Sequence, residues 1–257
     1  LAFPYNGAAS DYPICYKNIS NVEMIEIADK RELNRENSTK SFINLIKPKL
    51  LMPYSSDFAV IGPAAMRFAE FSNQWWANKK QVSKRYEESL GIRSVALNNS
   101  DLLIFGRDEL SNSKIKLIQD QKEEVSLREF ELNLYSNTCF VDEKYKPLNN
   151  DLNELTTKAA NHMFQYMDKI GIKSEWIFQV IFKDSIKKYS IDLDRRSVNE
   201  ITDLNVLGRN VLRVTLGCGY YEALLLGDAH WNNAQLSFQL EWERFPNKFN
   251  NALYTAI

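Results

Sequence analysis

The chain has 257 residues, 44% of them hydrophobic, which is enough for a substantial core in one large domain or two ordinary ones. Its 32 basic and 33 acidic side chains leave a formal net charge of −1, so the chain as a whole lacks the basic surface that nucleic-acid binding requires. It contains no Gly-rich loop of the common nucleotide-binding kinds, and its longest apolar runs are far too short to span a bilayer, so we expect a soluble protein.

The first hundred residues predict short strands that alternate with helices. Residues 1–18 are rich in Pro, Gly, Asn and Tyr and predict the end of a strand that runs into a structured loop. Helical patterns follow at residues 22–33 and 41–46, and the second should stop before Pro48. The apolar run at residues 50–54 predicts a buried strand.

Further along, regular apolar spacing predicts one helix over residues 64–89. Residues 94–97 and 102–105 predict two short strands joined by a turn. The polar stretch at residues 111–150 predicts a connecting segment, which makes residues 1–110 the first domain.

Residues 151–257 predict a small α+β domain. It opens with an amphipathic helix over residues 151–170, which Gly171 ends. The apolar face of this helix should include Leu152, Leu155, Tyr166, Met167 and Ile170. The pattern then predicts strands at residues 176–182, 189–194 and 211–216, a short helix at 220–226 and a last strand at 236–243. Gln239, Glu241 and Glu243 alternate with apolar residues in that last strand and should form a solvated acidic face.

Cysteine and histidine usage predicts no metal site that this chain could complete by itself. Cys15, Cys139 and Cys218 have neither a metal-binding spacing nor a disulfide framework, which favours free buried thiols in a reducing, cytoplasmic compartment. His162 lies inside the predicted helix and His230 in a loop, and a structural hydrogen-bonding role is expected for both.

Two loops are the best candidates for function. Residues 4–13 and 52–58 both follow short apolar strands and carry small polar side chains. Loops at the carboxyl ends of buried strands are where α/β proteins assemble their sites, although a structural role for either loop stays open at this point.

Three segments of the sequence resemble a known family. They are Phe3-Pro-Tyr-Asn-Gly-Ala with Tyr12-Pro-Ile-Cys-Tyr16, then Ile46-Lys-Pro-Lys-Leu-Leu-Met-Pro-Tyr-Ser-Ser-Asp-Phe58, and last Gly227-Asp-Ala-His-Trp-Asn-Asn-Ala-Gln235 with Arg244-Phe-Pro246. Together they resemble the later part of metallo-β-lactamase-fold proteins, in the branch that contains CMP-N-acetylneuraminate hydroxylase and its bacterial relatives. In that branch a small domain that looks like a sterol-carrier module follows the metal-binding domain.

The resemblance implies an architecture. Residues 1–110 would be the second half of a four-layer αββα metallo-β-lactamase-like sandwich, and residues 151–257 a sterol-carrier-like α+β domain. The main histidine motif of the family is absent from this sequence, and the chain begins at Leu1 without methionine. We therefore expect a piece of a longer or processed product, with the main metal-ligand histidines supplied by a missing N-terminal part or by a partner chain.

The resemblance also implies a chemistry: metal-dependent hydrolysis or oxygenation, with iron or zinc, of a nucleotide sugar or phosphorylated small molecule. Asp57 would ligate the metal or orient a ligand, while Tyr5, Asn6, Tyr54 and Ser56 would line the substrate pocket. A single carboxylate cannot hold a catalytic metal, so enzyme activity depends on the missing part. The alternative is a non-catalytic binding or assembly protein that uses an apolar cavity in the C-terminal domain.

Overall fold

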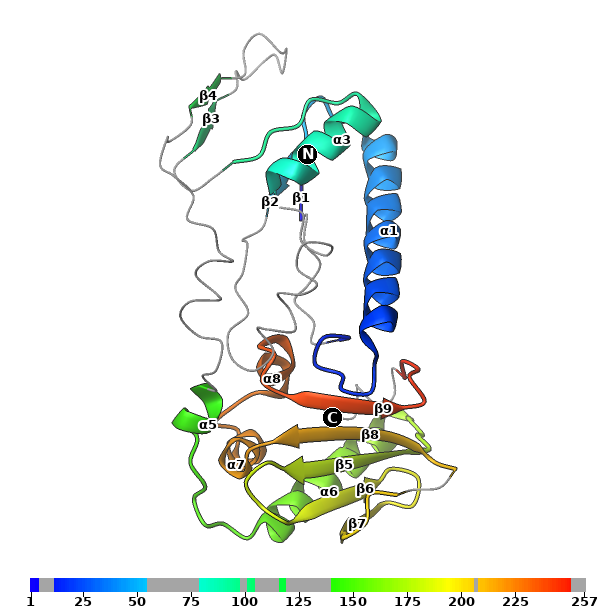
Figure 1. Ribbon diagram of the computed structural model, residues 1–257, viewed down its shortest axis with the longest axis vertical. Helices are drawn as coiled ribbons and strands as arrows, with labels where there is room; N and C mark the ends of the chain where they lie inside the picture. The colour runs from blue at the N-terminus through cyan, green and yellow to red at the C-terminus, as the bar shows by residue number, and fades with distance from the viewer. Residues whose placement is uncertain are drawn as a thin grey trace. The chain divides into compact units, whose positions relative to one another are not determined.

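The computed structural model describes residues 1–4, 12–54, 79–97, 101–104, 116–118, 140–205 and 208–250. Within these ranges the protein is a mixed α/β protein with six helices and three sheets (Figure 1). The chain divides into two compact units. Of the described residues, the first unit holds 1–4, 25–54, 79–97, 101–104 and 116–118, and the second holds 12–24, 140–205 and 208–250.

The elements follow one another in this order: β1 (Ala2–Pro4), α1 (Asn21–Ile46), β2 (Met52–Tyr54), α3 (Lys79–Leu90), β3 (Leu102–Ile104), β4 (Lys116–Ile118), α5 (Phe140–Lys144), α6 (Leu152–Ile170), β5 (Trp176–Phe182), β6 (Lys188–Asp192), β7 (Ser197–Glu200), β8 (Asn210–Leu216), α7 (Cys218–Leu226), α8 (Trp231–Leu236) and β9 (Glu241–Phe245).

The first unit contains parallel strands. β1 pairs with β2 in parallel, so that Pro4 lies opposite Tyr54. On the other side of β2, Leu51 forms a parallel bridge with Ser94. Since α1 precedes β2 and α3 precedes Ser94, the chain alternates strand and helix, which is the pattern of an α/β domain. The four-layer sandwich stays a prediction.

Helix α1 is one helix where two were predicted. The polar residues between the predicted pieces include neither Pro nor Gly, and Lys40 and Glu36 form an ion pair one turn apart, so nothing interrupts the helix. Ser20 and Glu23 form a reciprocal capping box at its start. The helix ends at Ile46, before Pro48, as predicted.

The predicted hairpin of residues 94–97 and 102–105 is wrong. β3 pairs with β4 instead, and Val95 joins the parallel sheet through its N–H bond to the Leu51 carbonyl. Val95 is buried against Leu50, so burial across the sheet outweighs the local turn signal. Of the helix predicted over residues 64–89, the described part is α3; residues 64–78 lie outside the described ranges.

The second unit contains a five-stranded sheet in the order β7-β6-β5-β8-β9 (Figure 1). The central strands β5 and β8 are parallel, and every other pair in this sheet is antiparallel. The predicted strands at residues 176–182, 189–194 and 211–216 and the helix at 220–226 are confirmed within one or two residues at most ends. The observed order adds strand β7 and helix α8 to the elements predicted for this half.

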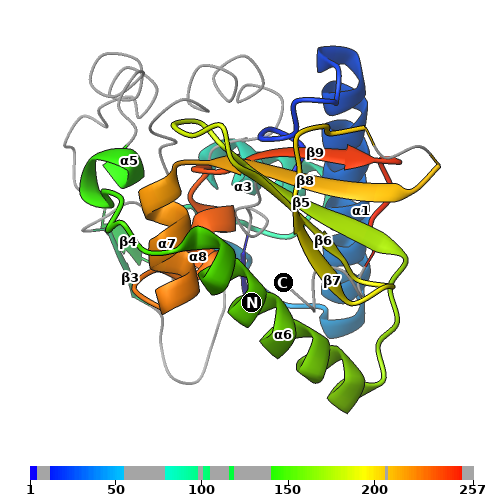
Figure 2. The same ribbon diagram turned by 90° about the horizontal axis from the view of Figure 1, so that it is seen from below.

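Helices α6, α7 and α8 cover one face of this sheet (Figure 2). Phe182 of β5 contacts Tyr221 of α7, and Phe178 contacts Trp231 of α8. Gly219 of α7 packs against the backbone that follows α5, where a Cβ atom would lie 2.7 Å from the Pro147 nitrogen. These contacts fill the layer between sheet and helices with aromatic side chains.

Helix α6 begins and ends where predicted, but its buried face differs. Asp151 caps it by accepting hydrogen bonds from the N–H groups of Asn153 and Glu154, and Gly171 ends it in the left-handed conformation. The predicted face included Tyr166 and Ile170, which are exposed. The observed buried residues are Leu152, Thr156, Ala160, Phe164 and Met167. A polar residue belongs to this face because the Thr156 hydroxyl bonds the Leu152 carbonyl and lies 3.1 Å from the Tyr221 hydroxyl.

The last predicted strand, residues 236–243, is partly wrong. Residues 231–236 form α8, Leu236 is exposed at its end, and the strand begins only at Glu241. Trp231 lies against Phe178 and Tyr221, so tertiary packing fixes a helical turn in a stretch for which the sequence predicted no helix.

Candidate functional site

The two candidate loops begin at the carboxyl ends of two neighbouring parallel strands, β1 and β2. Pro4 ends β1 and Tyr54 ends β2, and the two residues are paired in register. The chain therefore leaves the sheet toward both loops from neighbouring strand ends, the position where α/β proteins bind ligands. Tyr54 is 51% exposed at this edge. The other predicted site residues, Tyr5, Asn6, Ser56 and Asp57, lie outside the described ranges.

A cluster of buried hydrophobic side chains lies just before these strand ends. Phe3 and Leu51, one residue before Pro4 and three before Tyr54, are buried with Ile43, Val82 and Tyr86. The Phe3 and Tyr86 rings meet edge to face at 5.1 Å. Burial raises the pKa of the Tyr86 hydroxyl. Side chains from both helices thus fix the strands before they reach the candidate loops.

Ion pairs join the two helices of this unit. Arg85 of α3 lies 3.3 Å from a carboxylate oxygen of Glu32 and 3.8 Å from one of Glu36, both on α1. Arg35 also pairs with Glu32. These side chains are partly exposed, so each pair contributes about 1 kcal/mol at most. The main effect of these ion pairs is to orient α3 against α1.

The described residues offer no metal centre. Among them, no three His, Cys, Asp or Glu side chains lie together as a metal-ligand group. His162 lies on the exposed side of α6, not on its apolar face, and His230 is exposed before α8 without a side-chain capping bond, so the structural roles expected for both are not found. Cys15 and Cys218 are buried as predicted, while Cys139 lies outside the described ranges. The described residues therefore cannot form a metal site unless other residues supply further ligands.

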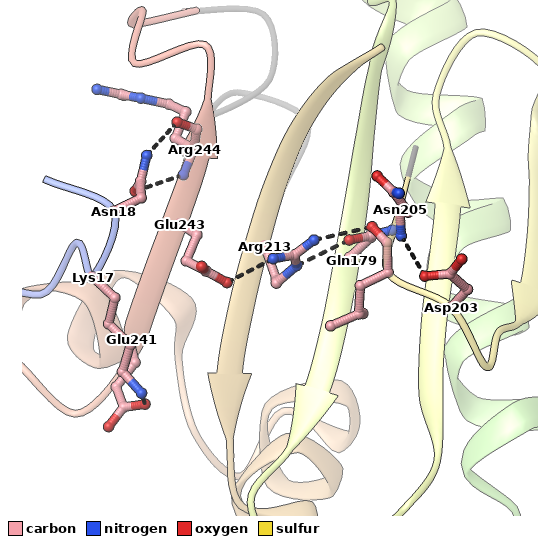
Figure 3. Close-up of polar contacts among 10 residues, drawn as sticks. Lys17, Asn18, Gln179, Asp203, Asn205, Arg213, Glu241, Glu243 and Arg244 are labelled. Carbon is pink, nitrogen blue, oxygen red and sulfur yellow. Dashed lines mark hydrogen bonds and ion pairs between the residues drawn. The ribbon is translucent and has the colours of Figure 1, made fainter. Parts of the chain in front are cut away.

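The acidic face of the last strand is not simply solvated. Arg213 of β8 donates to Gln179 Oε1 at 3.0 Å, to Glu243 Oε2 at 2.8 Å and to the Leu204 carbonyl at 3.1 Å (Figure 3). Gln179 is fully buried, and Arg213 is mostly buried. Glu241 pairs with Lys17. The prediction of a solvated face was wrong because the β7–β8 connection reaches this face at Leu204.

Sequence reasoning missed a segment that joins the edge of β9 through one parallel bridge, between Tyr16 and Trp242. Residues 12–18, which we call the edge segment, belong to the second unit. Trp242 donates its N–H to the Cys15 carbonyl and Lys17 donates its N–H to the Trp242 carbonyl, both at 2.8 Å. The apolar run Ile14-Cys15-Tyr16 after Pro13 was the available signal, and all three side chains are buried. The predicted domain boundaries at residues 110 and 150 stay predictions beside this finding.

Three ionisable side chains are buried near the amino end of α7. Burial raises the pKa of Tyr189 to about 12 and that of Cys218 to about 12, where a hydrogen bond to Asp184 adds to the shift. Burial also raises the pKa of Tyr221. A thiol with such a pKa is protonated at neutral pH and is a poor nucleophile.

We therefore expect the second unit to lose stability in alkali. The unfolded chain gives up tyrosine protons near pH 10, before the folded chain does, so stability is complete below pH 10 and falls as the pH rises toward 12. Thermal unfolding between pH 9 and pH 11.5 measures this fall. Tyr189→Phe should flatten it, because it removes a hydroxyl whose pKa is raised mainly by burial and which has no hydrogen-bond partner in the described part of the chain. Tyr166→Phe, at an exposed position, should leave it unchanged.

Comparison with known proteins supports no family. No family model matches the chain, and no curated protein matches it. Among solved structures, sterol carrier protein 2 like 2 from Aedes aegypti is similar, with a TM-score of 0.27, 9% identity and coverage of 41% of this chain and 94% of that chain. In the described part of the chain, no helix combines the length and apolar character of a membrane span.

Proposed function

We propose that this chain is the later part of a metal-dependent hydrolase or oxygenase that acts on a nucleotide sugar or phosphorylated small molecule in the cytoplasm. The family resemblance suggests the chemistry. The single structural observation that supports it is the parallel pairing of Pro4 with Tyr54, from which both candidate loops start. Tyr5, Asn6, Tyr54 and Ser56 would contact the substrate, and Asp57 would ligate iron or zinc or orient a ligand.

The remaining ligands must come from outside this chain in this proposal. Catalytic zinc and iron sites use about three protein ligands, and Asp57 would provide only one. The intact mass of the natural protein, measured with its bound metal, tests this requirement. A mass well above 29.8 kDa with about one or two metal equivalents supports the proposal. A mass of 29.8 kDa without metal overturns it and favours a non-catalytic binding or assembly protein.

Asp57→Ala in the complete natural protein tests the residue assignment. If Asp57 ligates the metal or orients a ligand, the change should weaken metal binding by about 10- to 100-fold, because such groups contribute directly to the affinity. Elemental analysis after dialysis against a weak chelator measures the loss. Asp29→Ala, at an exposed position on α1, is the matched control and should keep its metal. Equal metal content in both variants would remove Asp57 from the site.

A further inference from the structure

The carboxyl end of helix α1 exposes three large apolar side chains. Phe42, Leu45 and Ile46 are 52%, 80% and 45% exposed. Residues three and four apart are neighbours on a helix surface, so these side chains form one apolar patch. Ile43 is fully buried in the core of the first unit, and Leu45, two residues further on, lies on the opposite side of the helix. Adjoining exposed apolar side chains, unlike single ones, mark an interaction surface.

The charge beside this patch is positive. Residues 37–56 contain three lysines, Lys40, Lys47 and Lys49, and no acidic residue. Lys40 forms an ion pair with Glu36, whereas Lys47 and Lys49 follow the helix directly and are exposed. A helix end that combines apolar and basic side chains in this way is typical of helices that lie at an anionic membrane surface.

Shape and charge together select the occupant of the patch. The surface of a helix is convex, and a bilayer accepts convex apolar side chains without a matching groove. A second copy of the chain would bring the same lysines to the contact, and no acidic side chain from residues 37–56, so charge disfavours self-association. Anionic headgroups attract Lys47 and Lys49, whose long side chains reach the headgroups while the apolar side chains leave water.

We propose that the carboxyl end of α1, residues 42–49, is a membrane-surface binding site that takes anionic phospholipids. This inference is independent of the proposed metal chemistry. Phe42, Leu45 and Ile46 enter the boundary between headgroups and acyl chains, and Lys47 and Lys49 bind the headgroups. The contact is peripheral and leaves the core around Ile43 intact.

The test uses the full chain and vesicles of phosphatidylcholine with or without phosphatidylserine. The unaltered chain should sediment with the vesicles that contain phosphatidylserine, more weakly as salt is added, and not with phosphatidylcholine alone. Phe42→Ser/Leu45→Ser should lower the partition coefficient at least about tenfold, because two apolar side chains no longer leave water on binding. Leu33→Ser is the matched control and should bind like the unaltered chain, since Leu33 is 58% exposed and lies half a turn around the helix axis from Phe42.

The lysines are tested separately. Lys47→Gln/Lys49→Gln should lower binding to the phosphatidylserine vesicles about tenfold at low salt. Lys169→Gln/Lys173→Gln removes the same charge at exposed positions of the second unit and should change binding much less.

Circular dichroism in the near ultraviolet checks that each variant is folded. If Phe42→Ser/Leu45→Ser is unfolded, Leu45→Ser alone takes its place, because Leu45 is the more exposed of the two. Equal binding of the apolar variant and Leu33→Ser, or of the two lysine variants, overturns the proposal. No binding of the unaltered chain to phosphatidylserine vesicles overturns it in favour of a protein partner for the patch.

Discussion

Glu222→Ala should destabilise the second unit by about 3–5 kcal/mol, because it removes the acceptor of two backbone N–H groups. Glu222 is 1% exposed on α7, and its carboxylate accepts from the Leu148 N–H at 2.6 Å and from the Asn150 N–H at 3.1 Å. These bonds hold the segment between α5 and α6 against α7. Urea unfolding, followed by tryptophan fluorescence, measures the loss.

Two further variants make this result specific. Glu222→Gln keeps one acceptor oxygen but turns an NH₂ group toward the second backbone N–H, so it should lie between the native chain and Glu222→Ala. Glu154→Gln, at an exposed position on α6, should change stability by less than about 0.5 kcal/mol. A Glu222→Ala chain as stable as the Glu154→Gln control would show that the carboxylate does not hold this segment.

Arg213→Ala should cost about 2–4 kcal/mol, the second largest effect we expect. The change leaves Glu243 without its cation and removes the donors to Gln179 Oε1 and the Leu204 carbonyl. Glu243 keeps 28% of its side chain exposed, which places the cost below that of a fully buried pair. Arg213→Lys should recover only part of the loss, because an ammonium group cannot reproduce the planar guanidinium fork that donates to three acceptors.

Replacement of the whole pair separates charge from packing. Arg213→Met with Glu243→Leu should be more stable than Arg213→Ala, since no buried charge is left unpaired. Arg195→Ala, whose side chain is 74% exposed, is the matched control and should have little effect. Chemical denaturation of Arg213→Ala, Arg213→Lys, the double variant and Arg195→Ala provides the comparison. If Arg213→Ala unfolds at the same denaturant concentration as Arg195→Ala, the hydrogen bonds of Arg213 do not stabilise the second unit.

The structure describes only part of the segments that resemble a metal-dependent family. Of the five predicted site residues, Tyr54 lies within the described ranges, at the end of β2 and partly exposed. Pairing of β1 with β2 gives both candidate loops a common origin. The edge segment, by contrast, includes Tyr12-Pro-Ile-Cys-Tyr16 from the resemblance, and its buried side chains serve the sheet edge. In the structure, Tyr12-Pro-Ile-Cys-Tyr16 therefore packs against β9.

Local signals by themselves determined where most elements of the second unit lie. Asp151 and Gly171 marked both ends of α6 because a cap requires only a side-chain acceptor before the helix and a left-handed residue after it. The run that became β5 was recognisable because a strand buried on both faces is apolar along most of its length, whereas β8 was recognised from a less regular alternation of apolar and polar residues. The stop of α1 before Pro48 followed from the geometry of proline.

Tertiary structure decided what depends on distant partners. Ser94 and Val95 pair with Leu51 and not with the nearby strand, and Trp231 forms a helical turn against Phe178. Glu243 meets Arg213, and Asn18 meets Arg244 across 226 residues. Sequence periodicity shows that a residue is to be buried, but the partner is selected by packing over the whole chain, which no local pattern records.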